Sequence, residues 1–134
     1  MTSKVIYQGG LRTECTHLQS GSTFITDAPV DNNGKGEAFS PTDTVATALA
    51  SCMLTIMGIK ADQKSIDLIG SYGEVQKTMQ ATPRKISKIA VTLHLPKSID
   101  DKNQKLLEQA ALTCPVYQSL DPDMDKDVEF LWDI

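Results

Sequence analysis

The feature that most constrains this 134-residue chain is Thr44–Ile59, a run of 16 residues without a charged side chain. Just before it, Ser40, Pro41 and Asp43 predict a helix start. Serine is a common N-cap, proline suits the first helical position, and an acid at the third position can accept a hydrogen bond from the N-cap backbone N–H. The run is short for a membrane-spanning helix, which needs about 20 apolar residues. A helix this apolar on every side is expected inside a globular core, with Gly58 and the charges after it marking its end.

The segments on either side of this helix predict an α+β fold in a single domain, 1–134. Before the helix, glycine turns separate three short strands, which predict an antiparallel meander. After the helix, a long strand with alternating apolar residues is expected to pair with the segment that precedes that strand. Two more helices are expected to begin at capping residues and proline. The predicted elements are strands at Lys4–Gln8, Leu11–Leu18 and Ser22–Thr26, a loop at Asp31–Glu37, the central helix, strands within Ile66–Gln80 and at Arg84–Leu95, a helix capped by Ser98, a short helix from Thr113 or Cys114 to Leu120, and a strand at Asp127–Trp132.

The composition limits the partners and the compartment of the protein. With 13 Lys and Arg against 17 Asp and Glu, the net charge is −4 and no basic tract occurs, which argues against nucleic acid and anionic membranes as partners. The first ten residues lack the apolar stretch of a secretory signal, and three cysteines without such a signal indicate reduced thiols in a cytoplasmic protein. Hydrophobic residues make up only 40%, so an oligomer interface is expected to add to the core.

The three cysteines differ in their surroundings. Cys52 lies in the middle of the central helix, where a cysteine either packs as a small apolar residue or becomes reactive if a cation is brought to it. Cys114 lies at a predicted helix start, where unpaired N–H groups favour the thiolate and lower the pKa. Cys15 follows the acidic Glu14 and is interpreted as structural. Because 62 positions separate Cys52 from Cys114, only the fold decides whether they meet.

No other residues form a known catalytic or metal-binding motif. His17 and His94 stand alone, and neither C-x-x-C nor H-E-x-x-H occurs, so no metal or cofactor is predicted. Ser51 lacks the G-x-S-x-G frame of a nucleophilic serine. Arg12, one of only two arginines, follows a Gly-Gly turn and would take part in thiol chemistry only if it points at Cys52.

Two segments resemble motifs of the OsmC/Ohr family. FSPTDTVATALASCMLTIMGIKA is similar to the motif in which S/N-P-x-E-L opens the central helix and a cysteine follows about 11 residues after the proline, and ALTCPVYQSL is similar to the second-cysteine motif, where C-P-V/L begins a short helix. The resemblance covers essentially the whole chain. It implies an OsmC-like fold, with antiparallel sheets around a long central helix, and an intertwined homodimer with two sites at the subunit interface. It also implies a thiol peroxidase that acts on organic hydroperoxides.

Carried over by position, the resemblance implies a role for each site residue. Cys52 resembles the peroxidatic cysteine, Cys114 the resolving cysteine and Arg12 the arginine that activates the peroxidatic thiolate. The disulfide between the cysteines would then be reopened by a dithiol reductant, lipoyl-type or other. With residues of the partner subunit, the apolar side chains expected to line the hydroperoxide pocket are Leu49, Met53 and Ile56.

The chain departs from the family pattern at Thr42. Family peroxidases usually carry a glutamate there, which holds the activating arginine, whereas here the acid falls one residue later at Asp43. Successive side chains of a helix point about 100° apart around its axis, so Asp43 cannot simply replace a glutamate at position 42. An alternative function follows, in which a non-catalytic OsmC-like protein binds a small apolar or anionic ligand at the dimer interface and Arg12 is free to hold an anionic head group.

Overall fold

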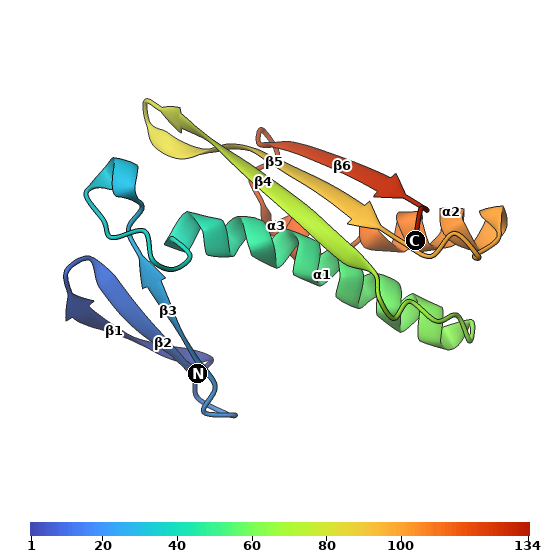
Figure 1. Ribbon diagram of the computed structural model, residues 1–134, viewed down its shortest axis with the longest axis horizontal. Coiled ribbons are helices and arrows are strands. Elements are labelled where there is room, and N and C mark those ends of the chain that lie inside the picture. The colour runs from blue at the N-terminus through green and yellow to red at the C-terminus, as the bar shows by residue number, and fades with distance from the viewer. The chain divides into compact units, whose positions relative to one another are not determined.

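The computed structural model describes residues 1–134 and has the α+β fold that the sequence predicts. Two three-stranded sheets, one long helix and two shorter helices make up the chain (Figure 1). The chain divides into two compact units, Met1–Val45 and Ala46–Ile134, which we describe separately. The single domain that the sequence predicts over 1–134 stays a prediction.

The first unit is built on the predicted antiparallel meander. Its strands are β1 (Ser3–Gly9), β2 (Arg12–His17) and β3 (Thr23–Asp27), in the order β1-β2-β3. Gly9 and Gly10 turn the chain between β1 and β2 with φ of 84° and 60°, which glycine adopts at little cost. A short 3₁₀ helix, Val30–Asn32, follows β3. The register places Arg12 opposite Asp27, so the start of β2 and the end of β3 lie side by side.

The long helix α1 (Pro41–Gln63) begins as the sequence predicts and ends among the charged residues that follow Gly58. Ser40 Oγ accepts a hydrogen bond from the Asp43 N–H (3.0 Å), and an Asp43 carboxylate oxygen accepts one from the Ser40 N–H (2.9 Å), which is a capping box. Gly58 does not end the helix. Its end is a Schellman motif in which the Ile66 N–H donates to the Ala61 carbonyl (2.9 Å) and Ser65 takes the left-handed conformation that glycine usually supplies.

By length and composition, α1 is the one helix that could cross a membrane. Its most apolar window has a mean hydropathy of 1.5, and 33% of that window is buried. The core helix of a globular protein passes the same test. Here the buried residues of α1, Met53 and Met57 among them, join the hydrophobic core of the second unit.

The second unit contains a sheet with one parallel pair. Its strands are β4 (Tyr72–Ala81), β5 (Arg84–His94) and β6 (Asp125–Leu131), in the order β4-β5-β6. The predicted β4–β5 hairpin is confirmed, but β6 runs parallel to β5, whereas the expected sheets were antiparallel throughout. A parallel pair needs a long crossover, which α2 (Asp101–Ala111) and α3 (Pro115–Ser119) supply. Asp100 caps α2, not Ser98, because its carboxylate accepts from the Asn103 N–H.

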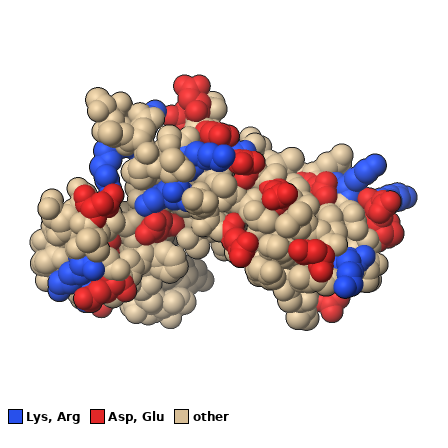
Figure 2. Space-filling view, turned by 45° about the horizontal axis from the view of Figure 1, so that its top comes forward, with Lys and Arg blue, Asp and Glu red and all other residues tan.

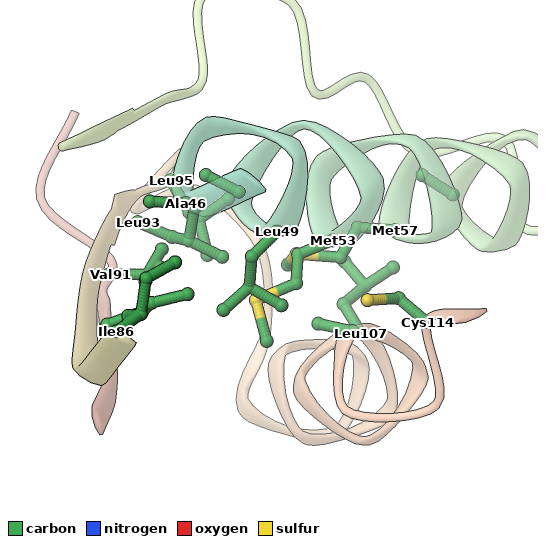
Figure 3. Packing of buried hydrophobic residues seen from close by; sticks show 14 residues of the cluster. Ala46, Leu49, Met53, Met57, Ile86, Val91, Leu93, Leu95, Leu107 and Cys114 are labelled. Atoms are coloured by element: carbon green, nitrogen blue, oxygen red, sulfur yellow. The ribbon is translucent and has the colours of Figure 1, made fainter. Parts of the chain in front are cut away.

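The core of the second unit lies between α1, β5 and α2. Figure 3 shows Leu49 and Met53 of α1 pointing toward the side chains of β5 and of the helix that carries Leu107. The side chains without exposed surface are Leu49, Met53, Met57, Ile89, Leu93, Leu95, Leu107, Ala111 and Cys114. Burial of this aliphatic set is the main stabilising term of the unit. On the surface, acidic and basic side chains are interspersed over the face in Figure 2 and form pairs such as Lys88–Asp127 (3.0 Å).

His94 on β5 lies in an acidic cluster at the end of the sheet. Its ring stacks on Tyr72, with centroids 4.5 Å apart. Its Nδ1 lies 2.9 Å from an Asp133 carboxylate oxygen, and its Nε2 lies 3.5 Å from Glu74. The hydrogen bond with Asp133 raises the pKa of His94 above its ordinary value, against the opposing effect of burial. The folded protein therefore binds a proton here more tightly than the unfolded chain does.

We expect the Asp133–His94 pair to stabilise the protein in acid and to lose this effect in base. Because the folded pKa is raised, the contribution is fully present below the unfolded pKa of about 6.5 and fades as the pH rises through the folded value. Thermal unfolding of wild type and Asp133→Asn should differ most below pH 6, and the difference should fade as the pH rises through the folded pKa of His94. A difference between the two proteins that stays constant with pH would contradict the assignment.

Candidate functional site

The fold brings Cys52 and Cys114 together. The Cys52 thiol, in the middle of α1, lies beside the Cys114 thiol at the start of α3 and interacts with it electrostatically. Both cysteines are reduced, as is Cys15 on β2. The question that the sequence left open, whether two thiols 62 positions apart meet, is therefore answered by the packing of α1 against the α2–α3 connection.

Local structure fixes Cys114 at this place. The last turn of α2 ends in the buried Ala111, whose carbonyl accepts a hydrogen bond from the Cys114 N–H (3.2 Å). Pro115 then occupies the first position of α3, which leaves Cys114 as the N-cap, one of the two residues that the sequence predicts there. Its Sγ accepts a hydrogen bond from the Tyr117 N–H (3.3 Å), and Figure 3 shows the side chain beside Leu107 in the core.

The two thiols have opposite environments. Cys114 has no exposed surface, whereas Cys52 is partly exposed. Burial raises the pKa of the Cys114 thiol, and the hydrogen bond from the Tyr117 N–H opposes this shift without cancelling it. The prediction that a helix start lowers the pKa of Cys114 is therefore wrong, because removal from water outweighs what a five-residue helix supplies. The pair consists of one accessible thiol and one thiol that stays protonated.

Arg12 is held by two carboxylates of the first unit. Its Nε and Nη2 donate to the two oxygens of Asp27 at 2.7 and 2.8 Å, which is a bidentate pair, and Nη2 also donates to Glu37 at 3.0 Å. Asp27 is 1% exposed, and the Glu37 N–H donates to it as well (3.2 Å). Hydrogen bonds with these acids raise the pKa of Arg12, so the guanidinium stays charged. The expectation that the missing acid at Thr42 leaves Arg12 free is therefore wrong.

This cluster occupies Nε and Nη2 of Arg12 with two carboxylates. An anionic group could therefore face Arg12 only through the remaining Nη1. The loop that carries Glu37 is tightly built, because a Cβ at Gly34 would collide with the carbonyl oxygen of Ala28. The Arg12-dependent form of the ligand-binding alternative thus loses its basis. Sequence reasoning missed Asp27 and Glu37 because no motif links them, and only the β2–β3 register puts Asp27 opposite Arg12.

We expect the Arg12–Asp27 pair to stabilise the protein down to strongly acid pH. The hydrogen bonds from Arg12 lower the pKa of Asp27, so its contribution is present above the unfolded pKa of about 3.9 and is lost as the pH falls through the lowered folded value. Asp27→Asn should therefore lower the Tm at pH 7, and the difference from wild type should shrink toward pH 2. Glu37→Gln is the matched control, since its 66% exposed side chain should have a smaller effect.

The three predicted pocket residues have different positions. Leu49 and Met53 have no exposed surface and pack in the core of the protomer. Ile56 instead lines an open groove of about 370 Å³ between α1 and α2, whose other apolar lining residues are Ile59, Leu106 and Ala110. The residues of α1 that line this groove recur every three or four positions and continue the helix face on which Cys52 lies. No group of three His, Cys, Asp or Glu side chains could hold a metal ion.

The chain belongs to the OsmC-like protein family, whose sequence model matches residues 34–129. That range contains Cys52 and Cys114 as well as Glu37, but Arg12 and Asp27 precede it. The resemblance drawn from the two cysteine motifs is thereby confirmed. No protein with curated function matches the sequence.

Solved structures agree with this assignment. A protein of Psychrobacter arcticus 273-4, named for osmotic stress induction and a detoxification response, is 55% identical over 97% of this chain and 95% of its own, with a TM-score of 0.94. An organic hydroperoxide resistance protein OsmC of Legionella pneumophila is 18% identical over 98% of this chain and 97% of its own (TM-score 0.76). An organic hydroperoxide resistance protein of Elizabethkingia anophelis is 12% identical over 99% of this chain and 97% of its own (TM-score 0.76). The last two share the OsmC-like fold with this chain.

Proposed function

We propose that the protein is a thiol-dependent peroxidase that reduces organic hydroperoxides in the cytoplasm. The observation that carries the proposal is the contact between the partly exposed Cys52 thiol and the buried Cys114 thiol in a chain of the OsmC-like family. Such a pair separates the two roles that a disulfide-forming peroxidase needs. One sulfur must be accessible to the peroxide. The other must lie beside it and stay reduced until the first is oxidised, so that the two can form a disulfide.

In this proposal the Cys52 thiolate attacks the distal oxygen of the hydroperoxide. The O–O bond breaks, the alcohol leaves with a proton, and Cys52 becomes a sulfenic acid. The Cys114 thiol then displaces the sulfenic oxygen as water and forms the Cys52–Cys114 disulfide. A dithiol reductant, lipoyl-type or other, returns both cysteines to thiols by exchange. Of the two cysteines of the pair, Cys52 has the exposure that the first step requires.

Arg12 is the proposed activating cation of the Cys52 thiolate, as its motif position implies. Asp27 and Glu37 support this role because they fix the direction of the guanidinium and keep it charged. A bidentate pair leaves the remaining N–H groups of an arginine in a set geometry. The acid that the family motif carries at position 42 would here be replaced by acids from β3 and the loop after it.

We also propose that the working form is a homodimer. In the first unit only Thr26, Asp27 and Ser40 are buried, so the meander has no apolar core of its own. Val5, Tyr7 and Phe24 are 59%, 65% and 51% exposed, and Ile6 exposes its side chain on the opposite face of the sheet. Exposed apolar surface of this kind marks an interaction site, and a second copy of the chain would cover it. Sedimentation equilibrium tests this directly, and a monomer at micromolar concentration would contradict it.

Stopped-flow oxidation of the reduced protein tests the proposed activity. Cumene hydroperoxide should oxidise wild type rapidly with the loss of two thiols, and hydrogen peroxide should react more slowly. In Cys114→Ser the first step should remain, one thiol fewer should be lost, and the sulfenic acid on Cys52 should be trapped by dimedone. Oxidation of wild type at the rate of an ordinary free thiol would contradict the proposal and favour the non-catalytic alternative of a ligand-binding protein.

A further inference from the structure

We propose that the reductant enters the cycle at Cys52 and not at Cys114, so that the reducing thiol forms its mixed disulfide with Cys52 and expels Cys114. The inference rests on the proposed function, because it concerns the disulfide that the peroxidase reaction leaves. The inference states which of the two sulfurs the reductant attacks. The chemistry alone does not decide this, since a thiolate can attack either sulfur of a disulfide.

Access decides between the two sulfurs. An attacking thiolate must approach along the line of the S–S bond, from the side away from the leaving sulfur. Cys114 has no exposed surface and lies in the core cluster, so the approach to its Sγ is filled by protein. Cys52 is partly exposed. On the same face of α1, the open groove along α2 begins one turn after Cys52, at Ile56, and has room for the aliphatic part of a thiol reductant.

The surroundings of Cys114 suit a leaving group. When the S–S bond breaks, its electron pair goes to Cys114 Sγ, which already accepts the Tyr117 N–H at the start of α3. That N–H stabilises the charge as it forms. The buried sulfur then takes up a proton, because burial raises the pKa of the Cys114 thiol. Once protonated, it closes the mixed disulfide only slowly, because a disulfide is attacked by a thiolate, whereas the sulfenic acid of the peroxidase step condenses with a thiol.

The exchange balances in two steps. A thiolate of the reductant bonds to Cys52 Sγ, and Cys114 leaves and is protonated. The second thiol of a dithiol reductant then attacks its own sulfur in the mixed disulfide, which releases Cys52 as a thiolate and the reductant as a cyclic disulfide. A monothiol stops after the first step unless a second molecule arrives. This difference allows the mixed disulfide to be trapped.

The trapping experiment uses the full-length Cys15→Ser protein, in which only the two site cysteines remain. Diamide oxidises the protein to the Cys52–Cys114 disulfide, which makes the test independent of peroxidase activity. Cysteamine, a small monothiol, is added in excess, and acid quenches the reaction within seconds. N-ethylmaleimide is then used to alkylate free thiols, and mass spectrometry of the peptides locates each group.

We expect cysteamine on Cys52 and N-ethylmaleimide on Cys114, in about tenfold or greater excess over the reverse pattern. The same reaction in guanidinium chloride should remove most of this preference, because unfolding exposes both sulfurs. Cysteamine mainly on Cys114, equal labelling in the folded protein, or no adduct on either cysteine would overturn the proposal. Failure of the proposed function has a different signature, namely that cumene hydroperoxide does not form the disulfide that diamide forms.

Discussion

Cys52→Ser is expected to reduce organic hydroperoxide turnover by at least about a thousandfold, because it removes the nucleophile that forms the covalent intermediate. The serine hydroxyl is similar in size and the side chain is only partly buried, so the fold should be retained. Steady-state turnover with cumene hydroperoxide and a dithiol measures the effect. Circular dichroism and a melting curve would show that the variant is folded.

Cys15→Ser is the matched control for this prediction. Cys15 lies on β2 in the first unit, where its sulfur is 3.9 Å from the Thr13 hydroxyl. Its removal should leave turnover within about twofold of wild type, since the sequence and the structure give it no place in the thiol pair. Equal turnover in Cys52→Ser and wild type would exclude the proposed mechanism. Loss of activity in Cys15→Ser would show that the reactive thiol had been misassigned.

Leu49→Ala is expected to lower the free energy of unfolding by about 2–5 kcal/mol, because it leaves a cavity in a close-packed core. Leu49 is fully buried and lies one turn before Cys52 on α1. Urea unfolding at pH 7 measures the change from the transition midpoint. Met53→Leu, also at a fully buried position, is the control, and its similar volume should limit the cost to less than about 1.5 kcal/mol.

The same variant separates two roles that Leu49 could have. If Leu49 lines a hydroperoxide pocket, Leu49→Ala should raise KM for cumene hydroperoxide while the stability changes little. If it packs the core, as its complete burial indicates, the stability should fall and the remaining folded protein should keep its KM. An unfolding free energy unchanged within about 0.5 kcal/mol would contradict the core assignment.

The sequence predicted most of the secondary structure because the signals are local. The capping box at Ser40 and Asp43, the glycine turn before Arg12 and the Pro115 helix start all depend on neighbouring residues, and all are present in the structure. One difference has a local cause as well. At the end of α1, Ser65 takes a left-handed conformation that glycine usually marks, so Gly58 does not end the helix and the end falls among the charges after it. The parallel pairing of β5 and β6 instead depends on the crossover through α2 and α3.

By itself the sequence determined the family, the central helix and the two cysteines on which a function can rest. Only the tertiary structure decided how those residues meet. It placed the Cys114 thiol in the core beside Cys52, where burial outweighs the effect of the helix start on its pKa. It also paired Arg12 with Asp27 across two strands. Contacts between distant segments depend on register and packing, and solvent exposure depends on what covers a side chain, so neither can be inferred from the residues around one position.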